Sequence, residues 1–384
     1  MGYYKFNSEN KITPVLKTKG VILLKKSCVL FLLLVSIQSI AGGSSSQTHS
    51  GANQAEKTHS LHNTSGHGHK KGGWMFSLRT MDMHMENNLD GSRGISSDEI
   101  VTTIPNRFYG VSGQPATLRV APIKMDSRMG MFSLMYAQTD TLSWMLMLHH
   151  IEKSMEFTTY MGGSGTTQRG NFKTKSSGMG DTTLSVLWKT FDKEYHQVRL
   201  NLGISLPTGD IDQKDFILTP MGMKPKSVLP YGMQLGSGTY DFLPGFTYSG
   251  NNGSASDWGF RYQAVLRIGE NHEDYTLGDN HKFSTWGAYS VTPWIKTSLG
   301  LSYKYEDDIN GIDTRVVLPV QTADPDNYGG DTFMAHFGVT FSGQNGYFLG
   351  HKIKFEYSKQ LDQNLNGIQM EMDDMFSASY QFSL

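Results

Sequence analysis

The chain has 384 residues, of which 38% are hydrophobic, 18% charged and 11% aromatic, and 42 are glycine. This composition fits neither a helical membrane bundle nor a largely disordered chain, and a formal net charge of −1 provides no basic surface for a nucleic-acid partner. The only cysteine is Cys28, and a mature chain without it suits an oxidising compartment.

The first predicted element is a secretory signal peptide over residues 1–41. Lys25 and Lys26 precede the apolar run 28–40, and the small residue Ala41 follows it, as in a cleavable signal. The run is shorter than the roughly 20 residues of a membrane-spanning helix, which favours a signal over an anchor. Since no later segment approaches such a helix, a membrane location requires a closed β-barrel.

Residues 42–73 are polar, rich in Ser, Gly and His, and without periodicity, which predicts a disordered periplasmic arm. The closely spaced His67 and His69 could chelate a divalent transition metal such as Cu(II). The alternative is a solvated linker whose histidines have no role. The candidate ligands of the arm are His49, His59, His62, His67 and His69.

From Trp74 onward the hydrophobic period is two, as in β-strands. Leu200, Leu202 and Ile204, for example, alternate with polar or small residues, and the pattern recurs to the end of the chain. The predicted strands are Trp74–Met85, Ser127–Gln138, Thr141–Met155, Gly178–Phe191, Tyr195–Leu206, Met233–Ser249, Trp258–Gly269, Phe283–Val291, Ile295–Glu306, Thr332–Ser342, Tyr347–Ser358 and Met372–Ser383.

Short and long connections alternate between these strands. Thr139-Asp140 is a tight turn, whereas Glu86–Asp126 and Pro207–Tyr231 are extended. Outer-membrane barrels have an even strand number, short periplasmic turns and long outward loops. We therefore predict an all-β, antiparallel up-and-down transmembrane β-barrel of about 12 strands over residues 74–384, with the arm and the C-terminus on the periplasmic side.

A soluble β-sandwich is the alternative fold. Aromatic residues near the predicted strand ends favour the barrel, because girdles of such residues mark the two membrane boundaries. They are Trp74, Phe76, Trp144, Trp188, Tyr248, Tyr303 and Tyr305.

Three segments resemble the meta-pathway phenol-degradation family of bacterial outer-membrane proteins. They are Met135–Asp140 (MYAQTD), Ser176–Thr182 (SSGMGDT) and Gly203–Asp210 (GISLPTGD). The similarity covers Trp74–Leu384. It implies a Gram-negative outer-membrane barrel, surrounded by outer-membrane lipid and inserted by the barrel-assembly machinery. It also implies a transporter of small hydrophobic solutes, and it carries over no catalytic or ligand residues.

The first three predicted strands are rich in methionine on one face. If Phe76 and Leu78 face lipid, the methionines of the first strand face the lumen, and the phases of the next two strands agree. Thioethers are soft ligands that select Cu(I), and by the same softness Ag(I). Methionine also fills irregular interior space, and a further alternative is an apolar wall for a hydrophobic solute. The predicted lumen-facing set is Met81, Met83, Met85, Met129, Met131, Met135, Met145, Met147 and His149.

The sequence holds no nucleophile elbow, HExxH motif or phosphate-binding loop, which indicates a non-enzyme that requires no cofactor. The favoured function is a passive channel or transporter, either for small hydrophobic compounds or linked to copper-type metal handling. One alternative is a non-conducting barrel that sequesters Cu or Ag ions through its His and Met residues. The other is a barrel-borne lipid enzyme, which would need only a few residues.

Overall fold

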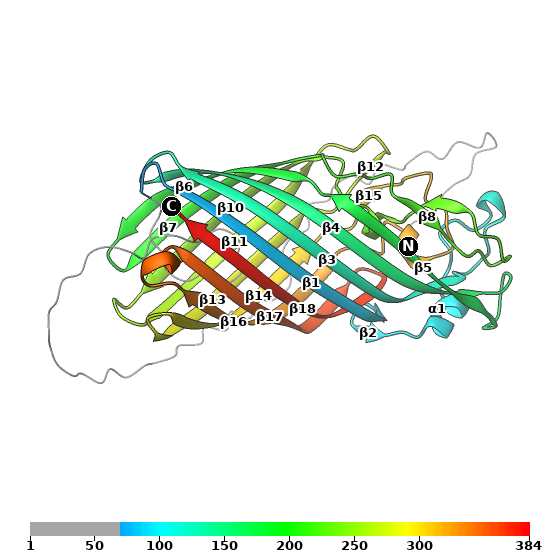
Figure 1. Cartoon of the computed structure of the whole chain (residues 1–384). Coiled ribbons are helices and arrows are strands. Elements are labelled where there is room, and N and C mark those ends of the chain that lie inside the picture. Colours follow the sequence, from blue (N-terminus) through cyan, green and yellow to red (C-terminus); the bar gives the residue numbers. More distant parts are fainter. Residues whose placement is uncertain (1–69) are drawn as a thin grey trace, which may run out of the picture. The chain divides into compact units, whose positions relative to one another are not determined.

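The fold is one β-sheet closed into a barrel, in a computed structural model that describes residues 70–384 (Figure 1). Its long strands are β1 (Trp74–Asp90), β3 (Val120–Ala137), β4 (Leu142–Tyr160), β5 (Gln168–Met179), β6 (Thr182–Lys193), β7 (His196–Leu206), β10 (Tyr240–Asn251), β11 (Ser256–Ile268), β13 (Asn280–Thr292), β14 (Ile295–Glu306), β16 (Gly330–Ser342), β17 (His351–Leu365) and β18 (Ile368–Ser383).

The wall has twelve strand positions. β5 and β6 pair one after the other with β4 and share one position, and all neighbours in the wall are antiparallel. β18 pairs with β1 along almost its whole length, which closes the barrel. The predicted all-β, antiparallel up-and-down barrel is therefore confirmed.

The two ends of the barrel differ. The turn end holds Trp74, Ser383 and short connections, and the loop end holds the long connections 91–119, 207–239 and 307–329 as well as the tight turn between β17 and β18 (Figure 1). No helix among residues 70–384 is long and apolar enough to cross a membrane. The short elements are β2 (Arg93–Gly94), α1 (Ser97–Thr103), η1 (Val111–Gly113), β8 (Lys214–Phe216), β9 (Lys226–Val228), η2 (Tyr231–Met233), β12 (Tyr275–Thr276), β15 (Asn310–Gly311), η3 (Gln321–Ala323) and η4 (Gly346–Phe348).

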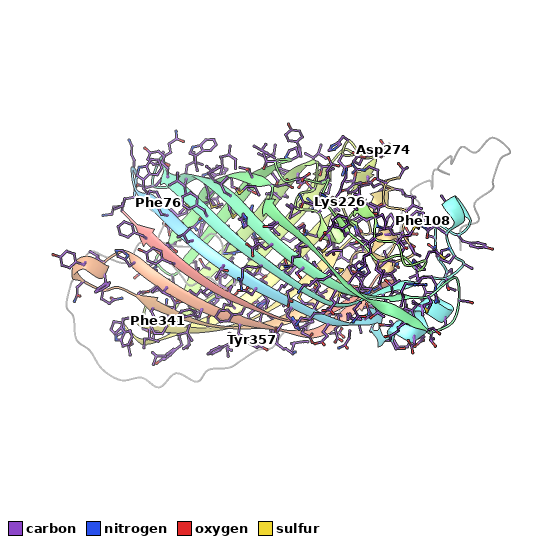
Figure 2. The ribbon with its side chains drawn as sticks, turned by 45° about the vertical axis from the view of Figure 1, so that its right-hand side comes forward. Phe76, Phe108, Lys226, Asp274, Phe341 and Tyr357 are labelled. Carbon is purple, nitrogen blue, oxygen red and sulfur yellow. The ribbon has the colours of Figure 1, made fainter. Side chains whose placement is uncertain are left out.

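Side chains alternate between the outside of the wall and the lumen, as the pleat of a strand requires. The outside carries exposed apolar and aromatic residues, among them Phe76, Phe341 and Tyr357 (Figure 2). Toward the loop end this apolar band gives way to charged pairs, such as Arg128 with Asp82 at 2.6 Å. The wall therefore extends beyond its apolar band.

Most predicted strands are confirmed, and Ile295–Glu306 matches β14 in full. β1 and β3 run further toward the loop end than predicted, because charged outward residues there hide the alternation of the strand. The predicted strand Gly178–Phe191 is wrong as one element: it is interrupted after Met179, and β5 precedes the break. Met233 was wrongly placed in a strand, and it lies instead in the turn η2, where its side chain is fully buried.

Two long connections, 207–239 and 307–329, form the loop plug. Leu229, Met233 and Val316 of the plug share one buried cluster with Met155 and Phe157, which project inward from β4. Burial of these apolar groups stabilises the plug against the inner wall. The loop end of the barrel is thus filled by a hydrophobic core.

Candidate functional site

The wall changes partners at a joint, Gly180-Asp181. β4 pairs with β5 toward the loop end and with β6 toward the turn end, whereas β7 pairs with β6. The Asp181 carboxylate accepts hydrogen bonds from the backbone N–H groups of Gly209 and Ser237, both at 2.8 Å, and from Ser237 Oγ at 2.9 Å. A Cβ at Gly209 would lie 2.7 Å from Gly236 Cα, so this contact requires glycine. Asp181 therefore fastens the loop plug at the break between β5 and β6.

An apolar cavity of about 350 Å³, the loop-end pocket, lies between the loop plug and the hairpin of β4 and β5. Phe157 and Phe172 line it with stacked rings, 4.9 Å between centroids. Leu218 of the plug adds aliphatic surface, and the exposed side chains of Met221 and Met223 also line the pocket. The pocket offers a small solute apolar contact close to solvent.

A second cavity of about 540 Å³, the lumen cavity, lies inside the barrel beneath the loop plug. Met129 and Met147 line it from the wall, and Ile309 lines it from the plug. The plug segment 229–234, which we call the partition, separates the two cavities. Its first two residues line the loop-end pocket, and Tyr231, Gly232 and Gln234 line the lumen cavity.

Two wall residues hold the partition by its carbonyl groups. Lys153 Nζ donates to Gly232 O at 2.9 Å and to Gln234 O at 2.6 Å. Ser176 Oγ donates to Met233 O at 2.7 Å. Hydrogen bonds from a charged donor are stronger than neutral ones, so Lys153 is the main polar anchor of the partition.

Two buried phenols join the halves of the plug. The Tyr328 hydroxyl accepts a hydrogen bond from Gly232 N at 3.1 Å and donates one to Thr322 O at 2.7 Å. The Tyr231 hydroxyl accepts one from Asp313 N at 3.0 Å. Burial raises the pKa of Tyr231 to about 12 and raises the pKa of Tyr328 above its ordinary value. Both phenols therefore stay neutral at physiological pH.

The predicted methionine set lies on the lumen side of β1, β3 and β4, as expected. Met81 is registered with Met129, and Met135 with Met145. Met129 and Met135 are six residues apart on one strand, or about 20 Å. The set therefore lines a wall and does not surround a single ion. We call Met81, Met83, Met85, Met129, Met131, Met135, Met145 and Met147 the methionine wall.

The members of this wall have different surroundings. Met135 and Met145 are 4% and 1% exposed and pack with Met75 and Leu187 in a dry cluster at the turn end. His149, beside the wall, lines the lumen cavity, and its Nδ1 donates to the backbone carbonyl of the joint residue Asp181 at 2.8 Å. Apolar packing accounts for the turn-end methionines, and the predicted metal role of the set stays a prediction.

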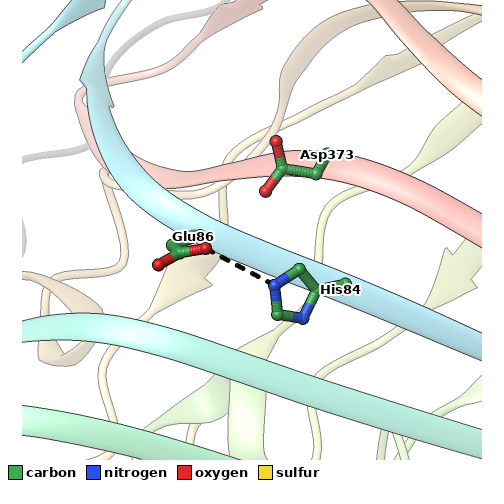
Figure 3. A group of neighbouring side chains, drawn as sticks. All are labelled: His84, Glu86 and Asp373. Atoms are coloured by element: carbon green, nitrogen blue, oxygen red, sulfur yellow. Dashed lines mark ion pairs between the residues drawn. The ribbon is translucent and has the colours of Figure 1, made fainter.

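Two other groups in residues 70–384 bring histidine and carboxylate ligand atoms within 4.8 Å of one another. His84, Glu86 and Asp373 form one, with His84 Nε2 3.6 Å from a Glu86 carboxylate oxygen (Figure 3). The other is Asp212, His272 and Glu273. Neither group contains a predicted ligand. Residues 42–69 of the predicted arm, with His49, His59, His62, His67 and His69, lie outside the described residues, as does the predicted signal peptide.

The sequence prediction missed the residues that hold the partition and the joint. Lys153 interrupts an apolar inward series between Ile151 and Met155, which was an available signal. The joint unites two of the segments that carried the family resemblance, since Asp181 contacts Gly209. The contact between these two segments could not be predicted, because it depends on where β5 ends and β6 takes over the pairing with β4.

No family model and no curated protein matches the chain. Among solved structures, it is similar to a COG4313 outer membrane channel from Pseudomonas putida F1, with a TM-score of 0.53 and 14% identity over 83% of this chain and 97% of that one. A Pseudomonas aeruginosa FadL homologue has a TM-score of 0.40 and 12% identity over 82% of this chain and 89% of that one. The Pseudomonas putida toluene transporter TodX has a TM-score of 0.39 and 10% identity over 81% of this chain and 89% of that one. The first likeness concerns the barrel fold. The resemblance to the phenol-degradation family stays a prediction.

Proposed function

We propose that the protein is a passive outer-membrane transporter for small hydrophobic solutes and catalyses no reaction. The observation that carries the proposal is the loop-end pocket, whose volume of about 350 Å³ falls in the range of small-molecule sites, roughly 300–1,000 Å³. Its aromatic and aliphatic lining suits a solute about the size of one or two aromatic rings. The channel and transporter names of the structural neighbours agree with this proposal.

A lipid surrounding follows from the outside of the wall. Soluble proteins rarely expose contiguous apolar patches larger than a few hundred Å², whereas here apolar residues are exposed around the barrel. The strands of 11 to 19 residues, β7 and β4 at the extremes, are long enough to cross a bilayer when tilted. In such barrels the short turns face the periplasm, so the loop-end pocket faces the cell exterior.

The proposed route runs from the loop-end pocket, past the partition, into the lumen cavity. Passage of a solute requires the partition to move, which breaks the hydrogen bonds from Lys153 and Ser176 to its carbonyl groups. Beyond it the solute meets Met129 and Met147, whose flexible, polarisable side chains adapt to apolar ligands of different shape.

The test fills the pocket. Gly163 lines it, and a side chain there would meet no atom within 4 Å of its Cβ. Gly163→Trp is expected to slow the uptake of phenylnaphthylamine, a neutral dye that intact outer membranes exclude, several-fold in cells producing the protein. Gly94→Trp is the control, since Gly94 is equally unhindered and lies outside the pocket. Equal uptake rates in the two variants would contradict the proposal.

A further inference from the structure

A buried hydroxyl group lies in the lining of the loop-end pocket. It belongs to Thr174 of β5, whose side chain is 1% exposed. Thr174 is registered with Met155, which projects inward from β4, so its side chain is also on the inner face. On this face it lies between Phe172, which lines the pocket, and Ser176, which holds the partition. The hydroxyl is therefore at the end of the pocket that is nearer the partition.

The Thr174 hydroxyl has no hydrogen-bond partner among residues 70–384. Neighbouring hydroxyls at the loop end do have partners. Thr159 Oγ1 donates to Leu218 O at 2.8 Å. Thr219, the other threonine that lines the pocket, accepts a hydrogen bond at Oγ1 from Met223 N at 3.0 Å. Since buried polar groups are normally paired, the Thr174 hydroxyl is a group whose partner the described chain does not supply.

Packing alone does not account for a threonine at position 174. Valine has the same branched shape, suits a strand equally well and carries no group that loses its hydration on burial. A buried hydroxyl without a partner costs stability. Departures of this kind from the most stable choice are expected where a side chain contacts a ligand.

The stacked rings of Phe157 and Phe172 lie on the same inner face, one inward position nearer the loop end. Phe157 follows Met155 by two residues on β4 and is registered with Phe172 on β5. Successive inward positions of a strand are about 7 Å apart, which is close to the length of a benzene ring with one substituent. A solute whose ring packs against Phe157 and Phe172 can therefore place an oxygen atom at Thr174.

We propose that the loop-end pocket selects solutes with one hydrogen-bond acceptor on an apolar body, and that Thr174 Oγ1 donates to this acceptor. An aromatic ketone or ester has this chemistry, with its ring against Phe157 and Phe172. A solute without the acceptor leaves the hydroxyl unpaired, and a second polar group on the solute would be buried against apolar surface. The inference rests on the proposed function and specifies its solute class.

The test compares acetophenone with α-methylstyrene, which have the same shape and differ in a carbonyl oxygen or a methylene group. Binding to the purified mature protein is measured by equilibrium dialysis in an uncharged detergent, with detergent alone as the reference. Thr174→Val should weaken acetophenone binding about three- to tenfold, because one neutral hydrogen bond is lost, and should leave α-methylstyrene binding within about twofold. Thr174→Ser keeps the hydroxyl and should keep most of the acetophenone affinity.

Thr322→Val is the matched control. Thr322 Oγ1 is also buried and has no hydrogen-bond partner among residues 70–384, but Thr322 belongs to the loop plug and does not line the pocket. This variant should bind both compounds as the wild type does. An equal loss of acetophenone affinity in Thr322→Val and Thr174→Val would overturn the inference, since the loss would not depend on the pocket hydroxyl.

The outcomes separate this inference from the proposed function. Unchanged acetophenone binding in Thr174→Val, as expected if a water molecule pairs with the hydroxyl, would overturn the inference alone. Equal weakening of both compounds would do the same, because Thr174 would then only shape the pocket. Gly163→Trp fills the pocket and should abolish binding of both compounds. Binding of both that persists in Gly163→Trp, or no binding to the wild type, would contradict the proposed function as well.

The stability of Thr174→Val gives a check that needs no ligand. Removal of a buried hydroxyl without a partner should keep or increase the urea resistance of the barrel. A marked decrease would show that the hydroxyl already has a partner in the ligand-free protein, and would overturn the inference.

Discussion

The methionine wall and the cross-strand row of Arg199, Thr247 and Arg261, which we call the arginine row, belong to one lumen and differ in chemistry. β1, β3 and β4 present mainly thioethers, although Arg79 and Lys153 also point inward there, whereas β7, β10 and β11 present guanidinium and hydroxyl groups. The outsides of the same strands are alike, with exposed aromatic and aliphatic residues throughout. A common surrounding imposes the outward residues of every strand, whereas the inward residues vary from one side of the barrel to the other.

The largest effect is expected when the residue type of one side of the lumen is placed on the other side. Met145→Lys would place a charge in the dry turn-end cluster, where Met145 is 1% exposed, and should cost more than about 4 kcal/mol or prevent folding. Arg199→Met removes a cation and loses a 3.2 Å hydrogen bond to Gln197. We expect a change within about 1 kcal/mol for that variant.

The measurement for this exchange is urea unfolding of the refolded barrels, followed by the gel mobility of the folded form. Similar losses of stability in the two variants would show that the two sides of the lumen do not differ in their tolerance of charge.

The joint lies between the two sides, since β5 and β6 separate β4 from β7. Asp181→Ala removes three hydrogen bonds and leaves the N–H groups of Gly209 and Ser237 without their acceptor. The free energy of local opening of the plug should fall by about 3 kcal/mol. Amide exchange at Gly209 and Ser237 should therefore become roughly 100-fold faster. Asp181→Asn keeps one acceptor oxygen and should fall between. Unchanged exchange in Asp181→Ala would mean that the plug is anchored elsewhere.

Whether the methionine wall needs sulfur or only apolar bulk is tested by replacing Met129, Met131, Met145 and Met147 with Leu. Such swaps conserve volume and usually cost less than about 1.5 kcal/mol each, so dye uptake should stay within about twofold of wild type. The predicted metal role requires Ag(I) binding, measured by titration, to be present in the wild type and lost in the variant. Ag(I) binding that survives the replacement would contradict that role for these four methionines.

The smallest expected effect concerns the loop-end contact of Arg315. It pairs with Asp212 and with Glu273, the latter at 2.7 Å. The hydrogen bond from Arg315 lowers the pKa of Asp212 below its ordinary value. The contact therefore stabilises the loops above the ordinary Asp pKa of about 3.9 and is lost as the pH falls through the lower folded-state pKa.

Because Asp212 is about half exposed, this contribution should be below about 1 kcal/mol. The protection factor of the amides near Asp212, which corrects for slower intrinsic exchange in acid, should fall between pH 5 and pH 3 in the wild type, and this fall should be absent in Asp212→Asn. The same fall in both proteins would assign it to another group.

The sequence was sufficient to predict the barrel, most strands and the lumen phase of the methionines, because a period of two fixes which face each side chain occupies. It was insufficient for the arginine row. Arg199 and Arg261 each have a visible inward phase, but their shared partner Thr247 is set by the register of three strands, which periodicity does not encode. The loop plug was missed for a related reason, since Leu229 and Met233 are buried by tertiary packing in a segment with turn-like sequence.

The most direct test of the proposed path is to locate a hydrophobic solute in crystals of the full-length mature protein grown with iodobenzene, by the anomalous scattering of iodine. We predict iodine peaks in the loop-end pocket and in the lumen cavity, on either side of the partition, and loss of the first peak in Gly163→Trp. Iodine bound only along the outer apolar band, with both cavities empty, would contradict transport through the lumen.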